Sequence, residues 1–331
     1  MFKGILSFFR KKKEVTPVYT PIASIPKPEI KHTLACLNAF IGQRKNISLL
    51  KDQIVGSAKN DKLCPHVLLF GDAGYGKTTL AKLIAEVYGT KFIHISGMNT
   101  FPKDIKNKLY MMSDNSVFFI DEVHALSSQS QEMLYEAMQD GTIDGMRINP
   151  FILVAATTRM GSLNKPFRDR FGIHLKMEDY SQVEIEDIVK YNSNGSKYRF
   201  DNEQDYHILE EIARRSKLIP RVALQIAKNV INRNDANIEE ELATSFVSVV
   251  EQMGIERDGL DKRDIGYLEA IARSDRGSAS IATIAACLSE SPADIMSIEG
   301  YLIKHGYVTV TPRGRSLTVK GKERIGNNVH E

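Results

Sequence analysis

The chain has 331 residues, of which 42% are hydrophobic and 26% are charged, and its formal net charge is +3 at pH 7. This composition fits a globular protein of two or three domains and excludes collagen-like, repetitive and low-complexity classes. The net charge is too small to establish a nucleic-acid partner, but basic residues gather in the N-terminal tail and near the C-terminal end. The three cysteines lack metal-site spacing, so we expect reduced core thiols and a cytoplasmic location.

Residues 1–33 are expected to form a basic tail followed by a proline-rich linker. Phe2, Ile5, Leu6 and Phe9 would share one face if the tail were helical, and basic residues follow them. This segment is far shorter than the ~20 apolar residues that span a bilayer, and it does not resemble a cleaved secretory signal. Two interpretations stay open: a mobile tail, or a peptide that docks on a membrane or on a partner.

Residues 71–78 read Gly-Asp-Ala-Gly-Tyr-Gly-Lys-Thr, which matches the phosphate-loop pattern G-x-x-x-x-G-K-[ST]. An apolar run precedes this loop and a helical apolar pattern follows it, which is the strand, loop and helix context that the motif requires. The glycines let backbone N–H groups turn toward the phosphates, Lys77 can reach the β- and γ-phosphates, and Thr78 offers a hydroxyl to Mg²⁺. The residues expected to contact ATP here are Gly74, Gly76, Lys77, Thr78 and Thr79.

Two further apolar strands are predicted to end beside the phosphate loop. The run at 117–120 ends in Asp121 and Glu122, and the run at 151–156 leads to Thr158. Asp121 would hold Mg²⁺ through water, and Glu122 would polarise the water that attacks the γ-phosphate. The tip of the last strand would present a polar side chain between the other two. The three strands together predict the core of an ATPase.

The apolar spacing divides the chain after the tail into three parts. Residues 34–178 alternate strands with helical patterns, as expected for an α/β domain built on a parallel sheet. Residues 179–256 show helical spacing only, which predicts a small helical lid domain. Residues 257–331 predict three helices closed by a hairpin, which is the pattern of a winged helix that grips DNA.

The hairpin of this winged helix carries a second candidate site. Its two β-type segments, 307–311 and 316–319, are joined by Pro-Arg-Gly-Arg, so Arg313 and Arg315 are expected at the hairpin tip. Arginines at that tip, beside further basic residues, would grip DNA phosphates. The alternative is a solvated hairpin in a domain that contacts protein.

In this order the elements resemble those of the RuvB family of AAA+ ATPases, the motors of Holliday-junction branch migration. The resemblance covers about residues 34–325, and two of its motifs are specific to RuvB: Ala-Thr-Thr-Arg at 156–159 and Thr-Pro-Arg-Gly-Arg at 311–315. The other motifs are Phe-Ile-Gly-Gln (40–43), the phosphate loop (71–80), Phe-Ile-Asp-Glu-Val-His (119–124), Arg-Asp-Arg-Phe-Gly-Ile (168–173), Pro-Arg-Val-Ala (220–223) and Tyr-Leu-Ile (301–303).

The resemblance implies a homo-oligomer, a hexameric ring in which each ATP lies between neighbouring subunits. Thr158 resembles the sensor that aligns the attacking water, and Arg170 resembles the arginine finger that reaches the neighbour's ATP. Arg221 resembles the second sensor, which extends from the lid to the γ-phosphate. By the same resemblance, Ile41 and Tyr180 would pack near the adenine.

The resemblance also implies an ATP- and Mg²⁺-dependent translocase that acts on duplex or four-way-junction DNA in recombination and repair. Two alternatives stay open: an AAA+ adaptor or remodeller whose winged helix binds a protein, and a clamp-loader-like switch that recruits DNA. Arg159 and Arg168 either assist the finger or form salt bridges.

Departures from the family pattern point to altered partners. Family members carry a long hairpin that docks on RuvA, whereas only residues 141–150 separate the corresponding elements here, so the hairpin is expected to be shortened or lost. A RuvA-like partner is therefore in doubt. Leu218 and Ile219 replace a Gly-Thr pair. Val310 stands where the family has an arginine that contacts DNA, while Arg315 remains.

Overall fold

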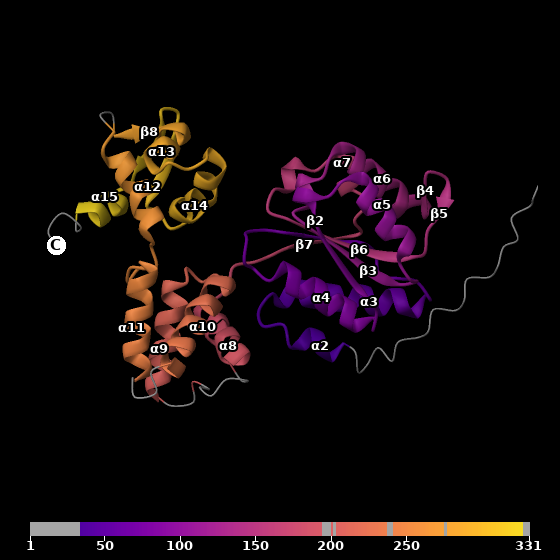
Figure 1. Ribbon diagram of the computed structural model, residues 1–331, viewed down its shortest axis with the longest axis horizontal. Helices are drawn as coiled ribbons and strands as arrows, with labels where there is room; N and C mark the ends of the chain where they lie inside the picture. Colours follow the sequence, from indigo (N-terminus) through magenta and orange to yellow (C-terminus); the bar gives the residue numbers. More distant parts are fainter. Residues whose placement is uncertain (1–33, 194–199, 201–202, 237–240, 275–276, 327–331) are drawn as a thin grey trace, which may run out of the picture.

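The described chain folds as an α/β domain, a helical unit and a winged helix, in that order (Figure 1). The computed structural model describes residues 34–193, 200, 203–236, 241–274 and 277–326. The tail and linker expected for residues 1–33 lie outside these ranges. The predicted fold class is confirmed.

A five-stranded parallel sheet forms the centre of the α/β domain, in the order β2-β3-β6-β1-β7. The strands are β1 (Val67–Phe70), β2 (Phe92–Ser96), β3 (Ser116–Asp121), β6 (Phe151–Thr157) and β7 (Ile173–Lys176). β6 therefore lies between β1, which leads into the phosphate loop, and β3, which ends in Asp121. This is the predicted place for the polar-tipped strand, and it follows that all three strand ends meet at one edge of the sheet.

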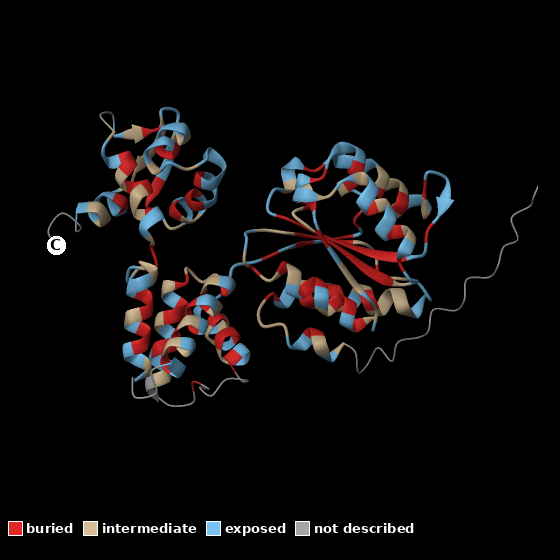
Figure 2. Cartoon of the chain, in the orientation of Figure 1, coloured by how far each residue is buried: buried red, intermediate tan, exposed pale blue. Residues whose placement is uncertain are grey.

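Helices cover both faces of the sheet, so the strands are buried between two layers (Figures 1 and 2). One face carries α2 (Ala35–Asn38), α3 (Arg44–Lys59) and α4 (Lys77–Val87), and the other carries α5 (Pro102–Met111), α6 (Ser128–Asp140) and α7 (Lys165–Arg168). Neighbouring residues of β3 alternate between two apolar cores: Phe119 packs into the first, and Phe118 and Ile120 pack into the second. A strand buried on both faces explains why its sequence is a continuous apolar run.

A short hairpin connects α6 with β6. Its strands are β4 (Thr142–Ile143) and β5 (Met146–Arg147), which pair antiparallel. The turn residues Asp144 and Gly145 have φ of 49° and 73°, as a type I′ turn requires. Lys106 of α5 forms an ion pair with Asp144, which ties the turn to the domain surface. The hairpin is therefore present, with strands of two residues each, so of the two expected outcomes its loss is wrong.

Helices alone form the described part of the second unit. They are α8 (Gln182–Ser193), α9 (Glu203–Arg215), α10 (Pro220–Ala236) and α11 (Leu242–Met253). Their buried residues, such as Ile185, Ile226 and Val230, join the apolar cluster that also fills one face of the sheet. The lid therefore packs as a continuation of the α/β core, and Pro220 begins the helix nearest the phosphate loop.

The third unit is a winged helix. It contains α12 (Lys262–Ala272), β8 (Ser278–Ala279), α13 (Ile281–Leu288), α14 (Pro292–Lys304), β9 (Val308–Thr311), β10 (Gly314–Leu317) and α15 (Val319–Gly326), with strand order β8-β10-β9. Val319, expected at the end of a strand, instead begins α15. The reason is local: the Thr318 hydroxyl accepts a hydrogen bond from the Gly321 N–H at 3.1 Å, which caps a helix.

The fold shows how the cysteines are buried and whether any helix could span a membrane. Cys64 is buried, but Cys287 on α13 is exposed, so the expectation of three core thiols is wrong for Cys287. Within the described residues no single helix is long and apolar enough to cross a membrane. α13 and α14 meet that test only as a pair bent by 106°, and both contribute side chains to the winged-helix core.

Candidate active site

The phosphate loop turns sharply between the end of β1 and the start of α4. Gly71, Gly74 and Gly76 have φ of 137°, 83° and 87°, a region that glycine adopts without the steric cost other residues pay. A side chain at Gly74 would also crowd Ile219 of the lid. These glycines are therefore required both by the backbone path and by the close approach of the lid.

Lys77 is folded onto its own loop. Its ammonium group donates to the carbonyl oxygens of Gly71 and Asp72, at 2.8 Å and 2.7 Å, and the residue is 7% exposed. Burial lowers the pKa of Lys77, while the neighbouring carboxylates of Glu122 and Asp121 act in the opposite direction. The side chain is thus placed inside the site, within reach of both acidic residues.

The end of β3 holds the two carboxylates that the sequence predicted. Asp121 is the last strand residue, and its Oδ1 accepts a hydrogen bond from the Glu122 N–H at 3.0 Å. Glu122 has φ of 48°, an unfavourable conformation for a non-glycine residue that is found preferentially at functional sites. A Cβ atom at Gly97 would collide with the Glu122 carbonyl oxygen. No sequence motif marks Gly97, because its role depends on a neighbour at the end of another strand.

The carboxylate of Glu122 has two side-chain neighbours. Its Oε2 accepts a hydrogen bond from the Thr158 hydroxyl at 3.2 Å, and it lies 3.1 Å from Nδ1 of His124. The same His124 nitrogen lies 3.0 Å from the hydroxyl of Thr157, at the end of β6. The strand predicted to carry a sensor therefore contacts the predicted catalytic glutamate directly, and His124 is a further polar contact that the sequence analysis missed.

One cavity joins these elements to the lid. It has a volume of about 360 Å³, and its lining residues come from the phosphate loop, the end of β3 and the start of α10. They are Ala73, Gly74, Gly76, Lys77, Thr78, Thr79, Asp121, Glu122, Pro220, Arg221 and Leu224. Arg221 is also joined to the loop by its backbone N–H, which donates to the Gly74 carbonyl oxygen at 3.4 Å. The cavity thus brings together most of the residues predicted to contact ATP.

Two predicted nucleotide residues lie behind the loop. The Tyr180 hydroxyl donates to the Tyr75 carbonyl oxygen at 3.0 Å, and burial raises the pKa of Tyr180 to about 12. A side chain at Gly42 would overlap the Tyr180 ring, and Ile41 packs against the same apolar core. Neither Ile41 nor Tyr180 lines the cavity described above. Their contact with adenine stays a prediction, whereas support of the phosphate loop by Tyr180 is direct.

Arg170 lies outside the cavity, on the surface beside α6. Its guanidinium donates to the Tyr135 hydroxyl at 2.8 Å and to the Gln139 side chain, and it lies 4.7 Å from the centre of the Tyr135 ring. Arg168 instead lies 4.0 Å from the carboxylate of its neighbour Asp169. Arg170 is therefore held at the surface by α6. It does not belong to the described residues that line the cavity of its own chain.

The two arginines of the winged helix differ in their surroundings. Arg313 is exposed in the turn between β9 and β10. Arg315, expected at the same tip, lies in β10, and its guanidinium bonds the Glu299 carboxylate at 2.5 Å and 3.3 Å. Glu299 also accepts a bond from the Tyr267 hydroxyl at 3.1 Å. The expected place of Arg315 is wrong because Glu299, on a different element, binds it within the domain.

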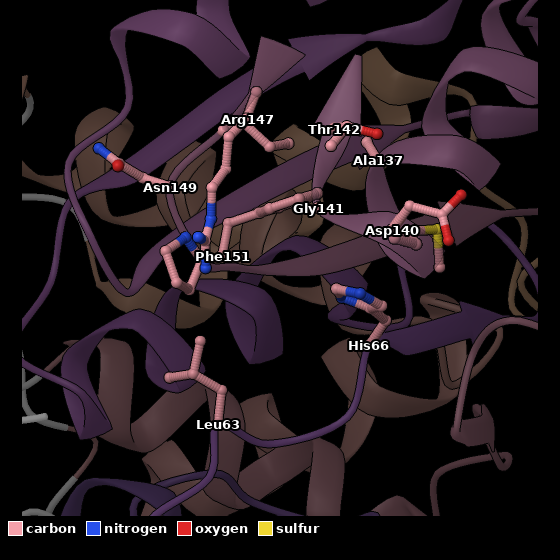
Figure 3. A pocket seen from close by; sticks show the side chains of 12 residues that line it. Leu63, His66, Ala137, Asp140, Gly141, Thr142, Arg147, Asn149 and Phe151 are labelled. Atoms are coloured by element: carbon pink, nitrogen blue, oxygen red, sulfur yellow. The ribbon is translucent and has the colours of Figure 1, made fainter. Parts of the chain in front are cut away.

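A larger cavity of about 480 Å³ lies at the opposite edge of the sheet, at the base of the hairpin (Figure 3). His66, just before β1, and Phe151, the first residue of β6, belong to its lining. Nδ1 of His66 accepts a hydrogen bond from the Leu153 N–H at 2.9 Å, and burial lowers the His66 pKa to about 4. Because the phosphate loop follows the other end of β1, this cavity is not the nucleotide site.

The donor set at the sheet edge fits Mg²⁺. The hydroxyl of Thr78 and the carboxylate of Asp121 belong to residues that line the same cavity. Hydroxyl and carboxylate oxygens are the ligands that this hard cation prefers, usually together with substrate phosphates and water. No nitrogen or sulfur ligand is needed for such a site.

A parallel sheet of this strand order with a phosphate loop, followed by a helical lid that touches the loop, defines the AAA+ class of P-loop ATPases. The chain also matches two family models: the Holliday junction DNA helicase RuvB P-loop domain over residues 34–177, and the RuvB C-terminal winged helix domain over residues 257–326. The chain belongs to the RuvB family.

Individual relatives agree with this assignment. The Holliday junction branch migration complex subunit RuvB of Wolbachia sp. subsp. Brugia malayi is 38% identical over 307 residues, covering 87% of this chain and 92% of the relative. The subunit of the same name from Anaplasma phagocytophilum is 36% identical over 321 residues, covering 92% and 96%. The solved structure of the Thermotoga maritima RuvB Holliday junction branch migration motor aligns with a TM-score of 0.78 and 34% identity, covering 88% and 96%.

Proposed function

We propose that this chain is an ATP-hydrolysing ring motor that translocates duplex DNA and drives branch migration of Holliday junctions in recombination and repair. The observation that carries the proposal is the cavity where phosphate loop, acidic strand end and lid arginine meet, in a chain whose residues 257–326 form a winged helix. The named function of the relatives supports the DNA substrate.

The cavity residues divide the chemistry among them. Lys77 leaves its two carbonyl partners to hold the terminal phosphates, and Arg221 approaches from the lid side. Glu122 accepts a hydrogen bond from the attacking water and polarises it, while Thr158 fixes the orientation of that carboxylate. Thr78 and Asp121 would hold Mg²⁺, which when bound neutralises charge on the phosphates.

The position of Arg170 supports the proposed ring. Transfer of the γ-phosphoryl group needs a cation to stabilise its charge, and in many ATPases an arginine of a neighbouring molecule supplies it. Arg170 is presented at the surface by Tyr135 and Gln139, away from the cavity of its own chain. We propose that it enters the cavity of the adjacent subunit. A hexamer, as the family resemblance implies, is the proposed stoichiometry.

DNA engagement is proposed to rely on the wing and the last helix. Arg313 in the turn and Lys322 on α15 are exposed cations, whereas Arg315 is held by Glu299. Contacts of such cations with phosphates carry no sequence information, as suits a motor that moves along any sequence. Binding should therefore weaken steeply as salt is raised.

The docking of a RuvA-like partner on the hairpin is proposed to be weakened. The hairpin spans only Thr142–Arg147 and its turn is held by Lys106. In addition, the Tyr110 hydroxyl of α5 donates to the Ile143 carbonyl oxygen at 2.9 Å. A hairpin bound along its own domain offers less free surface than a projecting one.

A protein partner of the winged helix is the second candidate function. Met296 and Ile303 on α14 are 57% and 38% exposed, and Val310 on β9 is 56% exposed. Exposed apolar side chains on the helix that commonly enters the DNA groove favour contact with protein over contact with phosphates.

The two functions are separated by one experiment. ATP turnover of the full chain is measured at low salt with no DNA, with duplex DNA and with a four-way junction. The motor predicts stimulation by DNA that Arg313→Ala reduces, while Arg273→Ala does not, because Arg273 is exposed directly after α12 and paired with Glu269. If an intact ring shows no stimulation by either DNA, the motor is rejected in favour of the protein-binding alternative.

A further inference from the structure

Asp179 connects the phosphate loop with the winged helix. Its Oδ1 accepts a hydrogen bond from the Tyr75 hydroxyl at 3.0 Å and forms an ion pair with Lys304 of α14. The bond to Lys304 is the main reason that the pKa of Asp179 is lowered, and the bond from Tyr75 lowers it further. One carboxylate oxygen thus joins residues from two units of the fold.

Tyr75 belongs to the phosphate loop and is fixed on both sides. Its side chain is buried and bonds Asp179, while its carbonyl oxygen accepts the Tyr180 hydroxyl at 3.0 Å. A shift of the loop that moves the Tyr75 ring would therefore strain its bond to Asp179, and the ion pair of Asp179 with Lys304 is the contact through which this reaches the end of α14.

A second connection runs through the lid. Lys217 forms an ion pair with Asp264 of α12, and its ammonium lies 4.9 Å from the centre of the Tyr301 ring on α14. The pair is well buried, with side-chain exposures of 14% for Lys217 and 2% for Asp264. An interaction so protected from water and salt holds its partners more firmly than an exposed ion pair does.

The same lid segment touches the phosphate loop a few residues later. Ile219 lies where a side chain on Gly74 would point, and the Arg221 N–H donates to the Gly74 carbonyl oxygen at 3.4 Å. Lys217 and Leu218 have φ of 58° and 57°, so the backbone between the two contacts is held in an unfavourable conformation. A segment of five residues therefore links the winged helix to the nucleotide cavity.

We propose that Asp179 and Lys217 form a two-point bridge that couples nucleotide binding in the cavity to DNA binding by the winged helix. Both are positioning residues, since neither lines the cavity. The bridge rests on the proposed function and specifies how DNA at one unit changes the affinity for ATP at another. Coupling of this kind is reciprocal, and its usual size is about 5- to 150-fold in affinity.

A route of contacts becomes coupling only when a thermodynamic cycle measures it. The affinity of the full chain for a fluorescent ATP analogue is therefore measured with and without duplex DNA, for the unaltered protein, Lys304→Met, Lys217→Met and the double variant. Thermal unfolding is recorded for each, and Lys304→Arg tests rescue of the ion pair. We expect each single variant to reduce the DNA effect about threefold or more, the double variant to remove it, and Lys304→Arg to retain it.

The matched control is Glu178→Gln. Glu178 adjoins Asp179 and lies 3.9 Å from Lys45 of the same domain, so the substitution removes a neighbouring surface charge without touching the bridge. Its DNA effect should equal that of the unaltered protein. A DNA effect that persists in the folded double variant overturns the bridge. An unaltered protein whose ATP affinity and turnover ignore DNA removes the proposed function, and the bridge with it.

Discussion

The Thr158 hydroxyl donates to the Glu122 carboxylate over 3.2 Å, and this bond joins the ends of two neighbouring strands. It holds the carboxylate for which we propose contact with the attacking water. Glu122 is therefore oriented by the strand ends of the sheet, with its φ of 48° as a further constraint.

Glu122→Gln should retain ATP binding and slow hydrolysis by about 10²-fold or more, because a neutral amide polarises the attacking water much less than a carboxylate does. Single-turnover hydrolysis and equilibrium binding of a fluorescent ATP analogue check the two parts. Lys77→Ala is the contrasting variant and should lose tight binding. Equal loss of binding in both variants would show that Glu122 is needed to hold the nucleotide.

Gly97→Ala should displace Glu122, since the added methyl group collides with its carbonyl oxygen. We expect hydrolysis to fall by about 10- to 100-fold while ATP affinity changes little, because small misplacements of catalytic groups have large effects on rate. The measurements are the rate of ATP turnover and the equilibrium affinity for ATP, each compared with the unaltered protein. Gly161→Ala is the control, as nothing lies within 4 Å of a Cβ atom there. Unchanged turnover in Gly97→Ala would contradict the role of Gly97.

Arg170→Ala should spare ATP binding and lower turnover by about 10³-fold, the usual contribution of an arginine finger. Mixing it with Glu122→Gln should restore part of the turnover, because some interfaces then combine an intact Glu122 with an intact Arg170. Arg168→Ala is the control, since Arg168 lies beside Asp169. Normal turnover in Arg170→Ala, or a fully active monomer, contradicts the ring mechanism.

Arg315→Ala should destabilise the winged helix by roughly 3 kcal/mol, because it leaves the buried carboxylate of Glu299 without its cation. Thermal unfolding checks this, and the double variant Arg315→Ala/Glu299→Gln should recover part of the loss. Arg313→Ala should leave stability unchanged and reduce the salt dependence of DNA binding by about one charge. If Arg315→Ala weakens DNA binding without any loss of stability, Arg315 contacts DNA directly.

His66 should make the protein less stable in mild acid. Its pKa is lowered from 6.5 to about 4 in the fold, so the unfolded chain binds a proton that the folded chain does not. The free energy of unfolding should therefore fall as the pH drops from 6.5 toward 4, by roughly 3 kcal/mol in total. Urea unfolding at several pH values checks this. His66→Asn, which keeps an acceptor for the Leu153 N–H, should make the free energy of unfolding less dependent on pH in this range. An unchanged pH dependence in this variant would contradict the role of His66.

The sheet, its strand order and the phosphate loop could be predicted because their signals are local. Three apolar runs of strand length lead into the phosphate loop, Asp121 and Thr158, respectively. Parallel strands bring such ends together at one edge of a sheet. The helical lid and the winged helix followed from apolar spacing in the same way.

Contacts between distant residues could not be predicted from the sequence. Tyr75 and Asp179 are separated by 104 positions, and neither residue type signals the other. The same holds for Arg315, whose motif predicts a place at the hairpin tip, whereas Glu299 of α14 binds it within the domain. The φ angle of Gly97 is not one that requires glycine. Glycine is needed there only because the Glu122 carbonyl oxygen lies where a Cβ atom would be. Such features depend on how different elements pack against each other. A local sequence pattern describes one element and does not show which side chains of other elements it will meet.

The two internal hydrogen bonds of Lys77 set a threshold for any ligand of the phosphate loop. A nucleotide must offer the ammonium group something better than the carbonyl oxygens of Gly71 and Asp72. Charged phosphate oxygens do so, since they add the attraction between opposite full charges to a hydrogen bond, which a neutral carbonyl oxygen cannot. A nucleoside monophosphate lacks the β- and γ-groups that the lysine would meet. We therefore expect the loop to select against nucleoside monophosphates by the length of the phosphate chain, before any catalytic group takes part.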